Sequence, residues 1–313
     1  MSAIGTLVFI LLGIVLLVTI ITQLVGFSAA SRSPRKGKTT KLSSGNIHWV
    51  ESGKGRPILM IHGLGGNLHN FTYALTAELS DSFRVIAIDR PGCGWSDRNG
   101  ADQATLAEQA RLIAEFIEAE ELGKPLIVGH SLGGAIAEAI ALNHPDHISA
   151  LALICPATAE VEVTPDAFKG IDISVPWLIP VIANTLAGAM SLLMEKKILA
   201  QVFAPEPVSP DFLTRGGGIL GRRPASFVAA AQDLTMSRAS VAQVLGREAE
   251  INIPVGVLYG AADNILAPIV HGKPFAEKTG GTYAELPGRG HMIPLTAPKE
   301  CAAFIRDMAG KSN

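Results

Sequence analysis

The sequence predicts an α/β fold in which a mostly parallel central sheet is flanked by helices, with an inserted helical lid and an N-terminal transmembrane helix. Three observations predict it. From residue 45 onward, apolar runs typical of strands alternate with helical patterns over short connections. One such run, 126–130, stops at a serine between two glycines and passes at once into a helical pattern. Residues 3–27 contain no charged side chain.

Composition sets the first limits on function. The chain has 313 residues, a net charge of −2 and 48% hydrophobic residues, enough for one large core or a core plus an inserted subdomain. This near-neutral charge gives no reason to expect a nucleic-acid partner. The cysteines Cys93, Cys155 and Cys301 lie far apart, without Cys-x-x-Cys or histidine spacing. We therefore expect no metal site, no disulfide framework and no organic cofactor, with Cys93 a small buried loop residue.

The N-terminal segment, 1–30, is long enough as a helix to span a hydrocarbon layer of about 30 Å. A secretory signal has basic residues before a short apolar core, whereas here only the α-amino group precedes a long apolar stretch. This pattern favours a membrane anchor. Ser28-Ala29-Ala30 has the small residues of a cleavage site, so a cleaved signal peptide stays open as the alternative.

The residues after this segment predict its orientation. Segment 31–44 is rich in Ser, Thr, Lys, Arg and Gly, which predicts a flexible basic linker. Its basic side chains all follow the apolar run, and the positive-inside rule then leaves the folded domain cytoplasmic; they are Arg32, Arg35, Lys36, Lys38 and Lys41. If the segment is a cleaved signal, the domain is exported instead.

The first part of the core, 45–156, alternates strands and helices with short connections, which implies right-handed crossovers and a mostly parallel sheet. Strands are predicted at 45–51, 57–61, 84–88, 126–130 and 148–155, and helices at 68–79, 104–121 and 135–143.

The alternation stops over 157–235, where helical fragments, prolines and a triple glycine predict a helical lid. Within it, 173–194 carries one run of apolar residues with Trp177 and no charge, although Pro176 and Pro180 argue against a simple second span. Two interpretations remain open. The segment is either an apolar roof over an acyl-binding pocket that touches the bilayer, or an ordinary packed helix.

The second part of the core, 236–313, resumes the alternation. A helix is predicted at 240–247, strands at 254–260 and 282–286, and a closing amphipathic helix at 298–308. Asp263 follows the first of these strands, and His291 follows the second. Both positions fall at the carboxyl ends of strands, where ligands bind in such sheets.

The strand–turn–helix around Ser131 predicts a site of chemistry. Glycines at 129 and 133 let the strand and the helix pass close together, and the turn lifts the Ser131 hydroxyl clear of the sheet. The Leu132 N–H and the helix N-terminus then point at an oxygen bound beside the serine, which stabilises negative charge on it.

On these residues, 45–310 resembles an α/β-hydrolase of the esterase or lipase type, with Gly129-His130-Ser131-Leu132-Gly133 as its nucleophile elbow. The resemblance implies that the segment after His62 supplies a second oxyanion N–H, from Leu64. It also implies that the Asp89–Asp97 loop borders the active site, where we interpret its polar residues as fixing the loop, and that the lid is variable. His62 is expected to brace its loop.

The order Ser131, Asp263, His291 agrees with the triad order of that family. We predict His291 as the base, because imidazole exchanges protons near neutral pH, and Asp263 as the group that orients it. Other histidines lie in helices or turns without that placement: His69, His144, His147 and His271. Asp89 and Asp97 belong to an earlier loop and are weaker rivals to Asp263.

The sequence thus predicts a membrane-anchored serine hydrolase that cleaves carboxylic esters of medium or long acyl chains, a small-molecule ester or lipid, through an acyl-enzyme. Within the resembling fold, a serine nucleophile argues against the epoxide-hydrolase and dehalogenase branches, which attack with a carboxylate. Carbon–carbon hydrolysis, amide or thioester hydrolysis and acyl transfer use the same triad and stay open. So does a ligand-binding receptor with little turnover. The oligomeric state is not predicted.

Overall fold

The computed structural model describes residues 2–161 and 163–312; Met1, Glu162 and Asn313, which fall in the predicted N-terminal segment, lid and second core part, lie outside them. Its centre is an eight-stranded sheet in the order β1-β2-β4-β3-β5-β6-β7-β8. The pairs β1–β2 and β2–β4 are antiparallel, and the other neighbours are parallel. This mostly parallel sheet confirms the predicted fold class.

Seven of the eight strands lie close to their predicted positions. Their bounds are β1 Lys38–Leu42, β2 Gly45–Ser52, β3 Arg56–Ile61, β4 Phe83–Ile88, β5 Leu126–His130, β6 Ala150–Ile154, β7 Val255–Gly260 and β8 Thr282–Leu286. Every residue of β5, β6 and β7 is buried. Continuous apolar runs in the sequence are the mark of such strands, because helices cover both of their faces.

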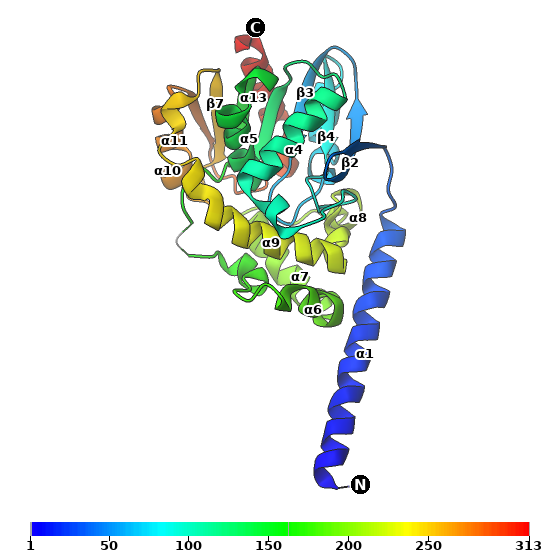
Figure 1. Cartoon of the computed structure of the whole chain (residues 1–313). Coiled ribbons are helices and arrows are strands. Elements are labelled where there is room, and N and C mark those ends of the chain that lie inside the picture. Colours follow the sequence, from blue (N-terminus) through cyan, green and yellow to red (C-terminus); the bar gives the residue numbers. More distant parts are fainter. Residues whose placement is uncertain (1, 162, 313) are drawn as a thin grey trace.

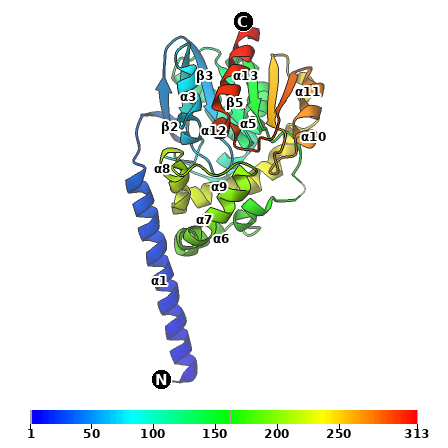
Figure 2. The ribbon, with the colours of Figure 1, turned by 180° about the vertical axis from the view of Figure 1, so that it is seen from behind.

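Helices cover both faces of the sheet, and the helices of the lid lie at the carboxyl ends of its parallel strands. Their bounds are α1 Ala3–Arg32, α2 His69–Thr72, α3 Leu75–Leu79, α4 Leu106–Ala119, α5 Leu132–Asn143, α6 Leu178–Ile182, α7 Gly188–Phe203, α8 Phe212–Arg215, α9 Pro224–Ser240, α10 Pro268–His271, α11 Lys273–Thr279, α12 Ile293–Thr296 and α13 Pro298–Lys311. In Figure 1, α4 and α5 lie in front of the sheet. Figure 2 shows α3 and α13 on the opposite face.

The carboxyl ends of the parallel strands face the lid. Asn67, after β3, donates from its side chain to the Gly217 carbonyl at 3.0 Å, and Gly290, after β8, donates to Glu206 at 2.7 Å. In Figure 1 the lid helices α6, α7 and α9 lie at the end of the domain from which α1 projects, and the C-terminus lies at the other end. The lid therefore separates the strand ends from the region around α1.

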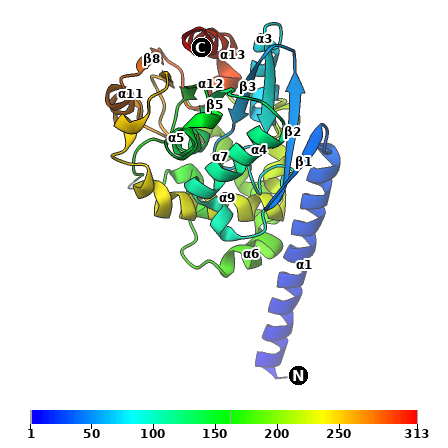
Figure 3. The same cartoon turned by 45° about the horizontal axis from the view of Figure 1, so that its top comes forward.

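α1 projects from the domain as one long helix (Figures 1 and 3). Its most apolar window has a mean hydropathy of 3.0 and no buried residue. The run Leu178–Phe203 is also long and apolar enough to cross a membrane, with a mean hydropathy of 1.5. Signal sequences and core helices share these properties, so length and composition alone do not decide the role of either helix.

The expectation of a flexible linker over 31–44 is wrong for its second half. Lys38–Leu42 forms the edge strand β1, paired antiparallel with β2 from Lys38 opposite Trp49 to Leu42 opposite Gly45. The Trp49 indole N–H donates to the Thr40 hydroxyl at 2.9 Å. Polar alternation on an edge strand looks like a linker in the sequence, because only one side of the strand is paired and Leu42 is its only buried residue.

Two helical predictions also need correction. The predicted helix 240–247 is instead the end of α9, which continues to Ser240, followed by the 3₁₀ turns Val241–Gln243 and Glu248–Glu250. The predicted helix 68–79 is divided into α2 and α3. The prolines of 173–194 lie before or within the first turn of the run that begins at Leu178, so a helix forms after them, and the expectation that this run is no simple second span stays a prediction.

α5 carries a carboxyl group that is buried in the core. Glu138 is 0% exposed, and neither of its carboxyl oxygens has a hydrogen-bond partner among the described residues. Burial raises the pKa of Glu138 to about 8, and the charge of Glu248 acts in the same direction. Above that pH the folded chain holds an uncompensated buried charge, which is unfavourable.

We expect the free energy of unfolding to fall as the pH rises from about 4.5 to about 8, because the unfolded chain has then released the Glu138 proton and the folded chain has not. Glu138→Gln should flatten this decline and raise the free energy of unfolding at pH 8 by about 1–3 kcal/mol. Denaturant unfolding of the full chain across this pH range measures it, with the exposed Glu277→Gln as control. Equal pH slopes for wild type and Glu138→Gln would contradict the assignment.

Candidate active site

Ser131 lies at the tight turn between β5 and α5 with φ 55° and ψ −122°. This left-handed conformation costs on the order of 1–3 kcal/mol for a non-glycine residue. A Cβ at Gly129 would lie 2.5 Å from the Gly133 carbonyl oxygen, and one at Gly133 would lie 2.1 Å from the Ile61 carbonyl oxygen. Both glycines are therefore required by the close approach of strand, helix and the end of β3.

The segment after β3 lies directly against Ser131. A Cβ at Gly63 would lie 2.8 Å from the Ser131 Cβ and 3.3 Å from its Oγ. The next residue is Leu64, and Leu132 follows Ser131 as the first residue of α5. Within the described residues, neither the Leu64 nor the Leu132 N–H donates to a backbone carbonyl. Two backbone donors near the serine are thus available to an oxygen bound there.

Asp263 and His291 come together from the ends of β7 and β8. The His291 Nδ1 donates to the Asp263 Oδ2 at 2.7 Å, and both side chains are buried. The other oxygen, Oδ1, accepts the N–H groups of Ile265 at 2.8 Å and Leu266 at 3.0 Å. Burial raises the pKa of Asp263. The charge of His291 and the hydrogen bonds lower the pKa by more than burial raises it, so the pKa lies below its ordinary value.

This arrangement orients both groups. The carboxylate stays ionised, and its bond to Nδ1–H leaves the Nε2 of a neutral His291 free to accept a proton. Within the described residues no hydrogen bond joins Ser131 to His291. Such bonds between catalytic groups are often long before substrate binds.

His130, to which sequence reasoning gave no role, connects the turn to the His291 loop. Its Nε2 donates to the His291 carbonyl oxygen at 3.1 Å, and the two rings lie 5.0 Å apart between centroids. Burial, and secondly the charge of His291, lowers the pKa of His130 to about 3, so it is neutral. The sequence feature that could have indicated a role for His130 is its position directly before Ser131.

Cys155, after β6, lies against the same pair. One ligand atom from each of Cys155, Asp263 and His291 falls within 4.8 Å of the others. Burial raises the pKa of Cys155 well above its ordinary value. Cys155 therefore packs against Asp263 as a neutral thiol.

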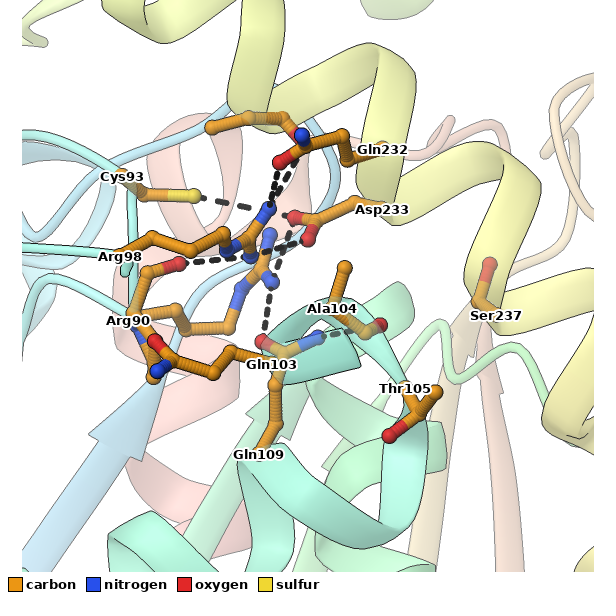
Figure 4. Close-up of polar contacts among 12 residues, drawn as sticks. Arg90, Cys93, Arg98, Gln103, Ala104, Thr105, Gln109, Gln232, Asp233 and Ser237 are labelled. Carbon is orange, nitrogen blue, oxygen red and sulfur yellow. Dashed lines mark hydrogen bonds and ion pairs between the residues drawn. The ribbon is translucent and has the colours of Figure 1, made fainter. Parts of the chain in front are cut away.

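A buried ion network joins Asp233 of the lid to Arg90 and Arg98 (Figure 4). Arg90, after β4, donates from Nε to the His62 carbonyl oxygen at 2.9 Å and from Nη2 to the Gly63 carbonyl oxygen at 3.0 Å. Its Nη1 lies 2.7 Å from Asp233 of α9, and Arg98 pairs with the other Asp233 oxygen. Arg90 and Asp233 are both 0% exposed. One cation thereby holds the Gly63 loop and the lid in a fixed relation.

The histidine and the loop around this network are structural, as the sequence indicated. The Nδ1 of His62 donates to the Gly63 carbonyl at 2.9 Å, and its Nε2 accepts the Arg90 N–H at 3.1 Å. Asp89 accepts the N–H groups of Leu68 and Trp95, each at 2.8 Å. Cys93 is buried, as expected.

A second contact joins the lid to the His291 loop. The Glu206 side chain accepts the Gly290 N–H at 2.7 Å and the Thr296 hydroxyl at 2.7 Å. A Cβ at Gly290 would lie 2.1 Å from the Ala204 carbonyl oxygen. The lid therefore contacts the segments on both sides of Ser131, through Asp233 and through Glu206.

The rival residues lie elsewhere or are otherwise engaged. His69 bonds the Thr72 hydroxyl, and His147 bonds Glu118 at the surface. His271 accepts the Ala159 N–H on its Nδ1. A cavity of about 540 Å³ borders the loop after β4 and α9, and it is lined by none of Ser131, Asp263 and His291.

Comparison with known proteins agrees with this fold. The profile of a family described as alpha/beta hydrolase fold matches residues 56–298. A pimeloyl-[acyl-carrier protein] methyl ester esterase of Chromobacterium violaceum is 30% identical over 270 residues, covering 84% of this chain and 97% of that protein. A monoacylglycerol lipase of Xenopus laevis is 26% identical over 290 residues, covering 87% and 82%.

A haloalkane dehalogenase of Mycobacterium tuberculosis is 27% identical over 301 residues, covering 86% of this chain and 93% of that protein. Among solved structures, a membrane phospholipase A described as a bacterial virulence factor has a TM-score of 0.67 and 22% identity. It covers 98% of this chain and 97% of that one. This last similarity shows the fold alone.

We expect Gly129→Ala to lower the free energy of unfolding by about 1–3 kcal/mol, because the added methyl group meets backbone atoms of Gly133 and Gly134 that cannot move independently. Gly221→Ala is the matched control, since a Cβ there has nothing within 4 Å. Denaturant unfolding of both variants measures the difference. Similar stabilities would mean that the turn has more room than its geometry indicates.

Asp233→Asn should destabilise the fold by about 3–5 kcal/mol, because it leaves the guanidinium groups of Arg90 and Arg98 buried without their carboxylate. The control is Asp172→Asn, whose partner Arg238 is partly exposed, and there we expect a loss of about 1 kcal/mol or less. Thermal unfolding of the two variants side by side tests this, and an equal loss would refute the role of burial.

Proposed function

We propose that this chain, which belongs to the α/β-hydrolase family, cleaves carboxylic esters with Ser131 as nucleophile, His291 as base and Asp263 as the group that orients the base. The observation that carries the proposal is the bond of 2.7 Å between His291 and Asp263 at the strand ends, beside a serine in a left-handed turn. Hydrolase activity is the coarser statement that family membership supports.

The first chemical step forms an acyl-enzyme. The Ser131 oxygen attacks the ester carbonyl carbon, and the Nε2 of His291 takes the hydroxyl proton. The carbonyl oxygen gains the negative charge, which the N–H groups of Leu64 and Leu132 stabilise. The bond to the alcohol oxygen then breaks, and His291 gives its proton to the departing alcohol.

The second step repeats the chemistry with water. His291 removes a proton from the water as its oxygen attacks the acyl carbon, and the Ser131 oxygen leaves with that proton. Asp263 stabilises the imidazolium in both steps through the Nδ1 bond.

The substrate class follows from the lid and the relatives. The lid run Leu178–Phe203 is apolar, which suits an acyl chain of medium or long length. An esterase and a monoacylglycerol lipase are among the relatives, and both names describe ester bonds. The dehalogenase relative makes halide displacement the rival activity. The resemblance described above implies a carboxylate nucleophile for that branch, whereas this chain carries Ser131 at the elbow.

Localisation is part of the proposal. The basic residues after α1 favour a cytoplasmic domain on an N-terminal anchor. Amide, thioester and carbon–carbon hydrolysis and acyl transfer remain the alternative reactions of the same triad, and a ligand-binding receptor remains the alternative to an enzyme.

We expect the full chain in detergent to hydrolyse p-nitrophenyl esters and to prefer longer acyl chains. Ser131→Ala should lower kcat by at least about 10³-fold, because no hydroxyl remains to form the acyl-enzyme. Ser80→Ala removes a surface hydroxyl that bonds only within its own turn, and it should leave the rate unchanged.

Two outcomes would overturn the proposal. Equal turnover by Ser131→Ala would show that another group attacks the substrate. A folded wild-type chain that hydrolyses no ester but is stabilised by ester-like ligands would favour the receptor instead.

A further inference from the structure

The lid helix contains a side chain from α1 within its hydrogen-bond ladder. The Thr22 hydroxyl donates to the Thr185 carbonyl oxygen at 2.8 Å and accepts the Ala189 N–H at 3.2 Å. In a regular α-helix that N–H would bond that carbonyl directly. The lid helix forms a π-helical turn over Ala183–Ala187, and the inserted hydroxyl accounts for it.

Small residues allow this close approach between α1 and the lid. A Cβ at Gly188 would lie 2.8 Å from the Thr22 carbonyl oxygen, and one at Gly26 would lie 2.9 Å from the Pro224 side chain. The Gln23 side chain adds a hydrogen bond to the Asn184 carbonyl at 2.8 Å. Thr22 and Ala29 are 0% and 1% exposed. The C-terminal part of α1 is thus built into the lid.

These contacts favour a membrane anchor over a cleaved signal peptide, the two roles left open for the apolar segment. A cleaved signal peptide has no reason to supply a buried hydroxyl to the folded domain that it leaves. The small residues Ser28-Ala29-Ala30 also lie within α1, and the Ala29 carbonyl accepts the Ser33 N–H at 3.1 Å. The candidate cleavage site is therefore helical and partly buried.

The remaining length of α1 matches a bilayer. Residues 3–21 precede the lid contact, and 19 helical residues span about 28 Å, close to the hydrocarbon thickness of about 30 Å. If this part crosses the bilayer, Thr22 and the lid that it contacts lie where the hydrocarbon ends.

The lid segment that Thr22 contacts carries exposed apolar side chains. Trp177 is 68% exposed and Leu193 is 76% exposed. Leu186, Met190 and Leu193 follow a spacing of four and three residues, which places them on one helix face. The other exposed large apolar residues between positions 175 and 194 are Val175, Val181, Leu192 and Met194. Large apolar surfaces of this kind mark contact with membranes or partners.

We propose that α1 is retained in the mature protein and that, together with the apolar face of α6 and α7, it forms one membrane-embedded unit. Residues 3–21 cross the bilayer. The Thr22 hydroxyl seats the lid on α1, and the face that carries Trp177, Met190 and Leu193 lies in the hydrocarbon edge of the adjoining leaflet.

Charge decides that α6 and α7 lie along the leaflet and do not cross it. Glu195, Lys196 and Lys197 follow one another in α7, and Glu195 pairs with Arg222 at 2.7 Å on the lid. Placing three consecutive charged residues within the hydrocarbon would be costly. At the leaflet edge, the lysines extend their ammonium groups to the head groups.

The position of the lid at the leaflet also indicates where the substrate comes from. For the ester hydrolysis proposed above, on which this step rests, the substrate class is an ester lipid held in the leaflet beneath the lid. The tests below measure retention and lid placement without turnover, and their failure is therefore distinguishable from the absence of esterase activity.

The first test is the intact mass and N-terminal sequence of the full chain isolated from the membranes of an expressing cell. We expect the mass of the chain with residues 3–30 present. A chain that begins at Ser31 would overturn the retention of α1.

The second test measures the contact of the lid with lipid. The full chain is reconstituted in phosphatidylcholine vesicles with and without bromine atoms on the acyl chains, which quench nearby indoles. We expect strong quenching in wild type and loss of most of the quenched emission in Trp177→Phe, because Trp49 is buried and Arg223 covers Trp95 at 4.1 Å. Equal quenching of both proteins would overturn the lid placement.

The third test asks whether the Thr22 hydroxyl seats the lid. Thr22→Val removes it at constant shape, and Thr19→Val is the matched control, because among the described residues Thr19 bonds only the Val15 carbonyl of its own helix. We expect quenching of Trp177 to fall by about half or more in Thr22→Val and to stay at the wild-type level in Thr19→Val. Equal values would refute the coupling between α1 and the lid.

Discussion

The close approach of β5 and α5 at Ser131 is the constraint on which the rest of the site depends. No atom larger than hydrogen fits at Gly129 or Gly133, and the strand must therefore pass into the helix with Ser131 in a left-handed turn. Gly63, in the segment after β3, packs against the same turn: a Cβ there would lie 2.8 Å from the Ser131 Cβ and 3.3 Å from its Oγ. The strain at one residue is offset by the surrounding core, in which every residue of β5 and β6 is buried.

Much of this arrangement was predictable from the sequence, because its causes are local. The buried strands β3, β5, β6 and β7 appear as continuous apolar runs, and the turn at Ser131 has its own glycine spacing. Asp263 and His291 were predictable from their positions after strands, and their bond of 2.7 Å agrees with that placement. The roles of Leu64 and Leu132 remain a proposal carried by backbone position.

What the sequence could not predict depends on contacts between distant segments. The polar strand β1 is defined by its partner β2 and has only one buried residue. The ion pair of Arg90 with Asp233 joins positions far apart in the chain, and no sequence pattern predicts that these two residues pair. The place of Thr22 inside a lid helix follows no periodicity of α1, because a threonine in an apolar helix looks like any other.

The buried network around Arg90 divides the lid into parts with different freedom. α9 is bound to the Gly63 loop through Asp233, and Glu206 binds the far end of α7 to the His291 loop. α6 and α7 precede both of these contacts in the chain, and neither helix contributes a residue to them. Their side chains can therefore vary in shape and bulk while Ser131, Asp263 and His291 keep their positions. For the ester hydrolysis proposed above, this stretch is where selectivity among acyl groups can change.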